Sequence, residues 1–424
     1  MKLKGNPKRG LIGTTLGFFI GFAAVSLYGP TAKYFKDAMG LTPAMVGLLV
    51  AIPALSGSLL RIPFGAWVDT TGGKKPFSIL LLTSVIGLGG VFTILMLTYP
   101  DKMTPSLFPL ILFFGFLSGC GIATFSVGIA QTSYWFPKSK QGMALGVYAG
   151  LGNVAPGLFT LILPFILKFY GIKSAYFLWF LILFIGTIIY LFVGCNAYFF
   201  QLLKQGSSKE EAEKKSKDMG QEVFPSGTVM DSLKISGKEW KNWALVAIYF
   251  TTFGGFIALT AWFPTYWREL YKFAPITAGV LTATYALLTS FIRIYGGSLA
   301  DKLGGEKVTL GSLIILLLGG MVLTFSSSFA LSLTGAVIMA AGMGTANGSV
   351  FKLVPLYIPK AVGGAAGWIG GLGAFGGFVI PPVMGYYVSK FGESGYSLGF
   401  SVFILLSLVS LGVILLIIKL GKKS

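Results

Sequence analysis

Residues 61–75 read RIPFGAWVDTTGGKK, and residues 293–307 read RIYGGSLADKLGGEK. The two segments agree at seven of fifteen positions without a gap, and they lie 232 residues apart in a chain of 424. The shared pairs are Arg61/Arg293, Ile62/Ile294, Gly65/Gly297, Asp69/Asp301, Gly72/Gly304, Gly73/Gly305 and Lys75/Lys307. An internal repeat of this kind indicates that the chain consists of two related halves.

The composition is typical of a membrane protein. Hydrophobic residues make up 54% of the chain, charged residues make up 11%, and the mean hydropathy is +0.79. Apolar stretches long enough to span a bilayer recur from end to end. We predict an all-α polytopic protein with twelve transmembrane helices in two six-helix pseudo-symmetric halves. The predicted helices are 11–35, 42–67, 76–98, 107–135, 141–168, 174–199, 243–268, 276–299, 308–327, 331–357, 361–388 and 396–419.

A polar segment divides these helices six and six. We therefore expect an N-terminal half at 1–199, a linker at 200–242 and a C-terminal half at 243–424. The linker has eight lysines against seven acidic residues, so its charges nearly balance. Ser208 and Glu211 have the spacing of a capping box, which predicts a short solvated helix. We interpret the linker as a tether rather than a binding domain.

The net charge of +19 is explained by its distribution. Of the 33 basic residues, 22 fall in the tails, in the linker or in loops on the side of the N-terminus, and eight fall on the other side. The positive-inside rule then places both termini and the 200–242 loop in the cytoplasm, and the protein in the cell (cytoplasmic) membrane. The charge therefore reflects topology and does not indicate nucleic-acid binding. The three remaining basic residues, Arg61, Arg293 and Lys352, fall within predicted helices.

The reactive residue types indicate neither a metal nor a cofactor site. The chain has no histidine, and its two cysteines, Cys120 and Cys195, lie in apolar segments without metal-ligand spacing. No carboxylate falls in the interior of a predicted helix, so general acid–base chemistry has no candidate group. A membrane enzyme or a receptor is therefore the weaker interpretation, and we expect no enzymatic activity.

The helix-embedded cations call for a partner. A rise of about 1.5 Å per residue places Arg61 and Arg293 roughly 12 Å inside the membrane and Lys352 roughly 10 Å inside it. All fourteen acidic residues map to loops or helix ends, so we expect no protein counter-ion at this depth. Because a buried charge without a partner is strongly disfavoured, a bound anion is the simplest partner. The alternatives are that the arginines bind helix carbonyls and that Lys352 reaches the nearby surface.

Other residues at similar depth suggest the shape of this anion. Phe125, Asn153, Tyr249 and Phe253 fall roughly 12–20 Å inside the membrane by the same count. A guanidinium is a planar fork suited to flat oxyanions, so Arg61 and Arg293 could hold one small planar anion between them. The aromatic rings would then supply a flat apolar wall.

The motifs resemble a known superfamily and, within it, one family. The G-x-x-x-D-x-x-G-G-x-K loops at 65–75 and 297–307 resemble those of the major facilitator superfamily, whose fold has two six-helix halves. The resemblance covers the whole chain. It implies that Asp69, Gly73, Asp301 and Gly305 take part in conformational change. More specific segments resemble the nitrate/nitrite porter family: FSVGIAQTSYWFPKSKQGMALGVYAGLGN (125–153), ANGSVFKLVP (346–355) and GWIGGLGAFGGF (367–378).

The family resemblance implies a binding site. It suggests that nitrate lies between Arg61 and Arg293, and that the site also contains the residues matching the family's aromatic and polar positions. Those residues are Phe125, Asn153, Tyr249 and Phe253, with Asn347 and Ser349 in the matched segment 346–355.

We therefore expect a secondary transporter of nitrate, with nitrite as a candidate second substrate. It would function as a monomer by rocking its two halves around a midplane site. Lys352 is the candidate for proton coupling, because it is the only ionisable side chain at site depth able to exchange a proton. This favours nitrate–proton symport. The alternatives are a nitrate/nitrite antiporter and a small-carboxylate exchanger of the oxalate or formate type.

Overall fold

The computed structural model describes residues 3–225 and 227–421, and within them it contains helices and no strand. The α-helices are α1 (Pro7–Ala23), α2 (Tyr28–Met39), α3 (Pro43–Leu59), α4 (Arg61–Thr71), α5 (Lys74–Thr98), α6 (Phe108–Trp135), α7 (Gln141–Val193), α8 (Tyr198–Lys204), α9 (Lys209–Asp218), α10 (Val229–Lys238), α11 (Trp240–Tyr249), α12 (Gly255–Tyr271), α13 (Pro275–Leu303), α14 (Gly305–Thr324), α15 (Phe329–Tyr357), α16 (Val362–Ala374), α17 (Gly376–Phe391), α18 (Ser394–Leu398) and α19 (Ser401–Gly421). Short 3-10 turns lie at Ala24–Leu27, Pro105–Leu107 and Lys138–Lys140, and a π-helical turn, η4, lies at Phe250–Gly254.

Within the described residues, eleven helical stretches are long and apolar enough to cross a membrane. One of them, Lys138–Val193, has 56 residues, which as a straight helix would be about 84 Å long, far more than a bilayer core of about 30 Å. Gly171 interrupts it with φ 74° and ψ 178°, a left-handed φ that glycine adopts without strain. The stretch therefore contains the two predicted helices 141–168 and 174–199, although the second ends at Val193.

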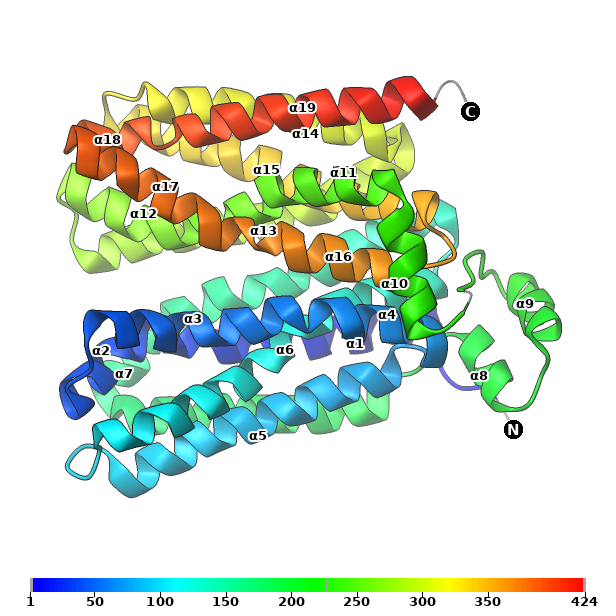
Figure 1. Cartoon of the computed structure of the whole chain (residues 1–424), viewed down its shortest axis with the longest axis horizontal. Helices are drawn as coiled ribbons and strands as arrows, with labels where there is room; N and C mark the ends of the chain where they lie inside the picture. Colours follow the sequence, from blue (N-terminus) through cyan, green and yellow to red (C-terminus); the bar gives the residue numbers. More distant parts are fainter. Residues whose placement is uncertain (1–2, 226, 422–424) are drawn as a thin grey trace.

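The helices form two bundles that lie side by side (Figure 1). The bundle drawn in blue to teal contains α1–α7, and the bundle drawn in green to red contains α11–α19. They meet where α13 packs along α7 and α16 packs along α4. Glycines make this approach possible: a Cβ at Gly65 would lie 2.7 Å from the carbonyl oxygen of Gly363, and one at Gly297 would lie 3.1 Å from Cα of Gly146. Small residues let transmembrane helices pack backbone to backbone in this way.

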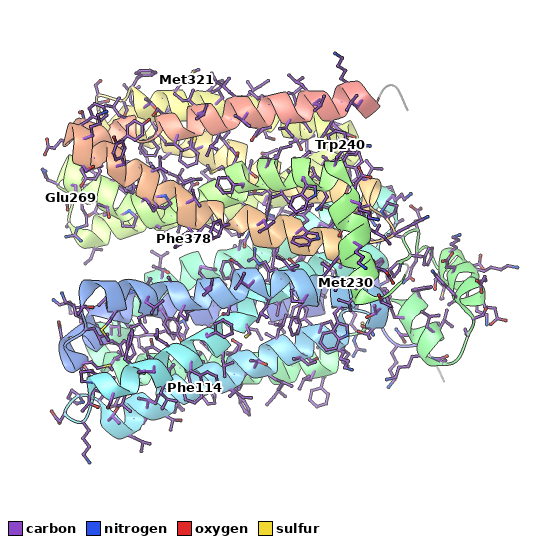
Figure 2. All side chains as sticks on the ribbon, viewed as in Figure 1. Phe114, Met230, Trp240, Glu269, Met321 and Phe378 are labelled. Carbon is purple, nitrogen blue, oxygen red and sulfur yellow. The ribbon has the colours of Figure 1, made fainter. Side chains whose placement is uncertain are left out.

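The two ends of the molecule differ. Helices α8 and α9 and the last turn of α19 lie at the same end (Figure 1), which we call the linker end. Met230 and Trp240 lie toward this end and Glu269 lies at the opposite end (Figure 2). This arrangement agrees with the predicted common side for the tails and the linker.

The linker contains the helices α9 and α10. The expected solvated helix is α9, and the side chain of Ser208 accepts a hydrogen bond from the backbone of Glu211 at 3.2 Å. A second helix, α10, was not predicted, although Thr228 and Asp231 form a reciprocal capping box at its start. Helix α10 packs against both α4 and α16, one from each bundle. Residues 200–242 therefore contact both bundles as well as connecting them.

Candidate functional site

Arg61 and Arg293 lie on opposite bundles but meet at one aromatic ring. Arg61 begins α4 and Arg293 lies in α13, and each side chain is only 1% exposed. The guanidinium carbons lie 4.8 Å (Arg61) and 5.4 Å (Arg293) from the ring centroid of Phe125. Both also lie within 5.8 Å of the ring centroid of Phe253. Cation–π attraction of this kind stabilises a guanidinium that has left water.

The aromatic wall consists of three nearly parallel rings. Phe125 of α6 is stacked with Phe253 of η4 at 5.8 Å and 9°, and Tyr249 of α11 is stacked with Phe253 at 4.8 Å and 10°. The rings of Phe125 and Tyr249 are inclined by 14°. Offset parallel stacking is a favourable geometry for aromatic rings. The arrangement presents flat apolar surface beside two planar cations, a geometry matched to a flat anion.

Several donors of the two guanidinium groups have no protein partner. Arg61 Nη1 donates to the carbonyl oxygen of Gly370 in α16 at 2.7 Å, and Arg293 Nη2 donates to the hydroxyl of Tyr249 at 3.2 Å. The Nε atoms of both arginines and Nη1 of Arg293 are buried without a hydrogen-bond partner. Within residues 3–225 and 227–421, neither arginine forms an ion pair. Carbonyl binding therefore accounts for one donor of Arg61 and leaves both charges without a counter-ion.

Two of the three expected polar residues have unpartnered acceptors. Asn153 is 4% exposed, Asn347 is 1% exposed, and the Oδ1 atom of each is buried without a hydrogen-bond partner. Ser349 differs, because its hydroxyl lies 2.7 Å from that of Thr309 in α14 and donates to the carbonyl of Ala346. The hydrogen bonds of the Ser349 hydroxyl therefore go to α14 and to its own helix. Two positions along a helix turn the side chain by about 200°, which places Ser349 on the other side of α15 from Asn347.

Lys352 also differs from the expectation. Its ammonium nitrogen donates to Asp301 Oδ1 at 2.6 Å and to the backbone carbonyl of Lys138. The expectation that this lysine has no carboxylate partner was therefore wrong. Asp301 lies in the last turn of α13, within reach of a long side chain on α15. Lys352 therefore has a carboxylate counter-ion within the described residues, unlike the two arginines.

Asp69, in the first loop motif, joins three parts of the chain at the linker end. Its carboxylate accepts hydrogen bonds from the backbone amides of Gly363 and Gly364, at the start of α16. It also accepts from the hydroxyls of Tyr134 in α6 and Ser232 in α10, both at 2.5 Å. A carboxylate at a helix N-terminus satisfies free amides and interacts favourably with the helix dipole. Asp69 thereby holds the bundles together.

Asp301, in the second loop motif, makes the matching contact. Its carboxylate accepts from the backbone amides of Gly142 at 2.9 Å and Met143 at 2.7 Å, at the start of α7. The glycines of the two motifs mark close approaches. A Cβ at Gly73 would lie 2.6 Å from the Gln131 Cβ, and one at Gly305 would lie 2.6 Å from a methyl group of Leu353. The linker end is therefore closed by two pseudo-symmetric contacts.

Comparison with known proteins places this geometry in a family. The sequence model of the Major Facilitator Superfamily matches residues 14–381 and 269–423. The chain is 31% identical over 386 residues to the nitrite extrusion protein of Bacillus subtilis. The aligned region covers 91% of this chain and 88% of the relative. It is 29% identical over 414 residues to the probable nitrate transporter NarT of Staphylococcus epidermidis, covering 96% and 95%. The chain belongs to the nitrate/nitrite porter family of the Major Facilitator Superfamily.

Solved structures show that this porter has the superfamily fold. A double-tryptophan mutant of XylE superposes with a TM-score of 0.74 at 13% identity, covering 95% of this chain and 93% of that chain. The Escherichia coli fucose:proton symporter FucP superposes with a TM-score of 0.64 at 14% identity, covering 94% and 98%. The predicted all-α fold is thereby confirmed, and the sequence comparisons confirm the predicted family.

The candidate site also contains a side chain and a backbone group that the sequence reasoning missed. Phe351 of α15 meets Phe125 and Tyr249 edge-to-face, at centroid distances of 5.3 Å and 4.8 Å, and lies 5.8 Å from the guanidinium carbon of Arg293. Its spacing of four residues from Asn347 was an available signal, because residues four apart share a helix face. The carbonyl of Gly370 could not be found in this way, because backbone contacts leave no side-chain pattern.

Proposed function

We propose that this porter transports nitrate across the cytoplasmic membrane by alternating access, with nitrite as its second substrate. The observation that carries the proposal is the pair of buried guanidinium groups, which share one aromatic ring and lack a carboxylate. A planar anion with three oxygens can accept from both forks at once. The names of the relatives, nitrate transporter and nitrite extrusion protein, support the same substrates.

The site geometry favours nitrate over a small carboxylate. The three near-parallel rings beside the guanidinium groups suit an ion that is flat in all its atoms. Formate is also flat but has two acceptor oxygens, so it would use fewer of the unpartnered donors of Arg61 and Arg293. Leaving a buried donor without a partner costs about 1–3 kcal/mol. We therefore expect nitrate to bind more tightly than formate.

Exchange is the transport mode that this geometry supports best. Without an anion, the site would close around two guanidinium charges and no carboxylate, and buried unpaired charge is costly. An anion should therefore be needed in both directions of the cycle. Proton symport through Lys352, expected from the sequence, is less well supported because its ammonium is paired with Asp301.

The proposal is tested by uptake of labelled nitrate into proteoliposomes that contain the purified protein. Vesicles preloaded with nitrate or nitrite should take up label much faster than vesicles without an internal anion, at fixed voltage and without a pH gradient. Formate should compete weakly. Equal uptake in loaded and empty vesicles would contradict exchange, and uptake that depends on a proton gradient would favour symport.

We further propose the arrangement of the chain in the membrane. The halves 1–199 and 243–424 would rock about the arginine site, with the linker end in the cytoplasm and a monomer as the functional unit. The support is the common position of α8, α9 and the end of α19 (Figure 1) together with the basic residues of the linker. The test uses two variants, each with one cysteine introduced, at Lys214 or at Glu269. A thiol reagent that cannot cross the membrane should label the cysteine at position 269 in intact cells and should not label the one at position 214.

A further inference from the structure

A basic groove lies at the linker end, away from the arginine site. Two adjoining cavities of about 660 Å³ and 520 Å³ share Lys74, Asn196 and Lys204 in their walls. Lys75 lines the larger cavity, and Lys4 and Arg9 line the smaller one. No acidic residue lines either cavity. We define the basic groove as these two cavities with the five cations Lys4, Arg9, Lys74, Lys75 and Lys204.

Specific hydrogen bonds build the walls of the basic groove. The side chain of Asn196 accepts from the backbone amide of Lys74 at 2.8 Å and donates to the carbonyl of Thr71 at 3.0 Å. The side chain of Gln201 bonds the backbone of Lys4 in both directions, at 2.8 Å and 2.7 Å. The segment after α7, the α4–α5 turn and the N-terminal segment are thereby fixed around one space, so the cations are not simply scattered on flexible loops.

Among the residues that the structure describes, no acidic side chain forms an ion pair with a cation of the groove. The ion pairs formed by the described residues are Lys272–Glu393 and Lys352–Asp301, and neither involves the groove. Arg9 donates to the carbonyls of Phe192 and Val193 at the C-terminal end of α7, at 2.6 Å and 3.1 Å. The negative end of the α7 dipole therefore stabilises the charge of Arg9. Within residues 3–225 and 227–421 the other four form no ion pair, although the ammonium of Lys75 lies 5.4 Å from the ring centroid of Trp67.

Topology alone does not require this cluster. In the internal repeat, Lys74 corresponds to Glu306, whose carboxylate accepts a hydrogen bond from Tyr357 at 2.6 Å. The second motif therefore has one acid and one base where the first has two bases, although the two loops lie at equivalent places in the repeat. The positive-inside rule needs an excess of basic residues on one side and does not need them to converge on one space.

The apolar part of the wall indicates what kind of anion fits. Leu191 and Phe192 line the smaller cavity, and Phe192 is 76% exposed one residue before α7 ends. Because it is one residue from the end of a membrane-spanning helix, Phe192 lies near the boundary between the hydrocarbon core and the lipid headgroups. Cations within the groove and an apolar flank beside it match a phosphate ester attached to acyl chains.

We propose that the basic groove binds the headgroup of an anionic phospholipid in the leaflet at the linker end. The phosphate would lie among Arg9, Lys74 and Lys204, and the acyl chains would run along Phe192. Basic pockets between transmembrane helices on the cytoplasmic side are typical sites for such headgroups. Thr70 and Thr71 also line the groove and directly follow Asp69, so a bound lipid would contact the turn that closes the linker end.

The test compares binding of fluorescent phosphatidylglycerol by the purified full-length protein and by two variants. Lys74→Gln/Lys204→Gln should weaken binding by about tenfold or more, because each basic residue contributes about 1 kcal/mol. The matched control, Lys214→Gln/Lys215→Gln on α9, removes the same charge from an exposed helix outside the groove and should bind like the original protein. Arg9 stays unchanged because its carbonyl bonds hold the helix end.

Three further arms identify the ligand. Phosphatidylcholine vesicles without phosphatidylglycerol should not displace the probe, and phosphatidylcholine vesicles containing phosphatidylglycerol should displace it. Inorganic phosphate should displace it only weakly, because it lacks the acyl chains. Equal binding by both double variants would overturn the proposal. Full displacement by inorganic phosphate at low concentration would also overturn it, since the groove would then take a soluble phosphate. A cooperative thermal unfolding transition of each double variant would show that it is folded.

Discussion

Asp69 and Asp301 each accept hydrogen bonds from the second and third residues of a helix in the opposite bundle. Asp69 contacts Gly363 and Gly364 of α16, and Asp301 contacts Gly142 and Met143 of α7. Their remaining partners differ in charge. Asp69 receives the neutral hydroxyls of Tyr134 and Ser232, whereas Asp301 receives the ammonium of Lys352. The two closing contacts are therefore symmetric in backbone geometry and unequal in electrostatics.

Because of this inequality, Asp301→Asn should lower the thermal unfolding temperature more than Asp69→Asn does. The first variant leaves the partly buried ammonium of Lys352 beside a neutral amide and without its carboxylate partner, which should lower the stability of the protein. The second variant leaves no charge unpaired, so its thermal unfolding temperature should fall less. Adding Lys352→Gln to Asp301→Asn should recover part of the loss, whereas adding it to Asp69→Asn should not. Additive effects in both double variants would contradict the pairing.

Ser232 predicts a role for the linker in closing the molecule. Its hydroxyl donates to Asp69 and accepts from the amide of Gly364 at 3.1 Å. Ser232→Ala should weaken the closed linker end by about 1–3 kcal/mol. The measurement is hydrogen exchange of the α16 amides, which should become faster when the linker end opens more often. Cysteine labelling at Gly65 or Gly363 is less suitable, because a cysteine side chain would disturb the contact itself.

Ser236→Ala is the matched control for that experiment. The hydroxyl of Ser236 is also buried, but it donates to the carbonyl of Ser232 within α10. This variant should leave exchange of the α16 amides nearly unchanged. If the two serine variants accelerate exchange equally, α10 acts through general packing and Ser232 has no special part in closure.

Lys352→Gln distinguishes exchange from proton symport. If the lysine serves the Asp301 contact, the variant should keep nitrate–nitrate exchange and should show the same response to a pH gradient as the original protein. Acid-driven uphill nitrate uptake by the original protein that is lost in Lys352→Gln would instead restore the proton-coupling role predicted from the sequence. The measurement is labelled nitrate uptake with and without an imposed gradient.

Phe351→Leu tests the residue that sequence reasoning missed. Leucine keeps an apolar group but removes the edge-to-face contacts with Phe125 and Tyr249, each worth about 0.5–1.5 kcal/mol. The KM for nitrate should rise several-fold while the protein stays folded. Phe325→Leu is the control, because Phe325 is 76% exposed outside the site. Equal KM values for nitrate in the two variants would contradict a role of Phe351 in nitrate binding.

The sequence predicted the parts of the fold that leave a periodic or repeated signal. The paired motifs revealed Arg61 and Arg293, and helical rise placed them at the same depth as Phe125 and Phe253. Contacts between distant segments left no such signal. The ion pair of Lys352 with Asp301 depends on how α15 and α13 pack, and a depth count along single helices cannot show it.

The linker shows the same limit. The capping box of Thr228 and Asp231 could be recognised in the sequence. The sequence of a ten-residue helix gives little indication of which helices it packs against. Ser349 was predicted in the site because of its motif, whereas its hydroxyl bonds Thr309 and the carbonyl of Ala346. Residues in one motif point in different directions, so motif membership alone does not assign a side chain to a site.

Nitrate binding by the purified Arg61→Lys and Arg293→Lys variants tests the central claim most directly. Lysine keeps the positive charge but loses the planar fork, so a site that uses both forks should lose affinity in each variant. We expect each dissociation constant for nitrate, measured by isothermal titration, to rise by at least about tenfold, with little change in the thermal unfolding temperature. Arg268→Lys, in the last turn of α12 outside the site, should bind like the original protein. Near-normal nitrate binding by either site variant would contradict the account.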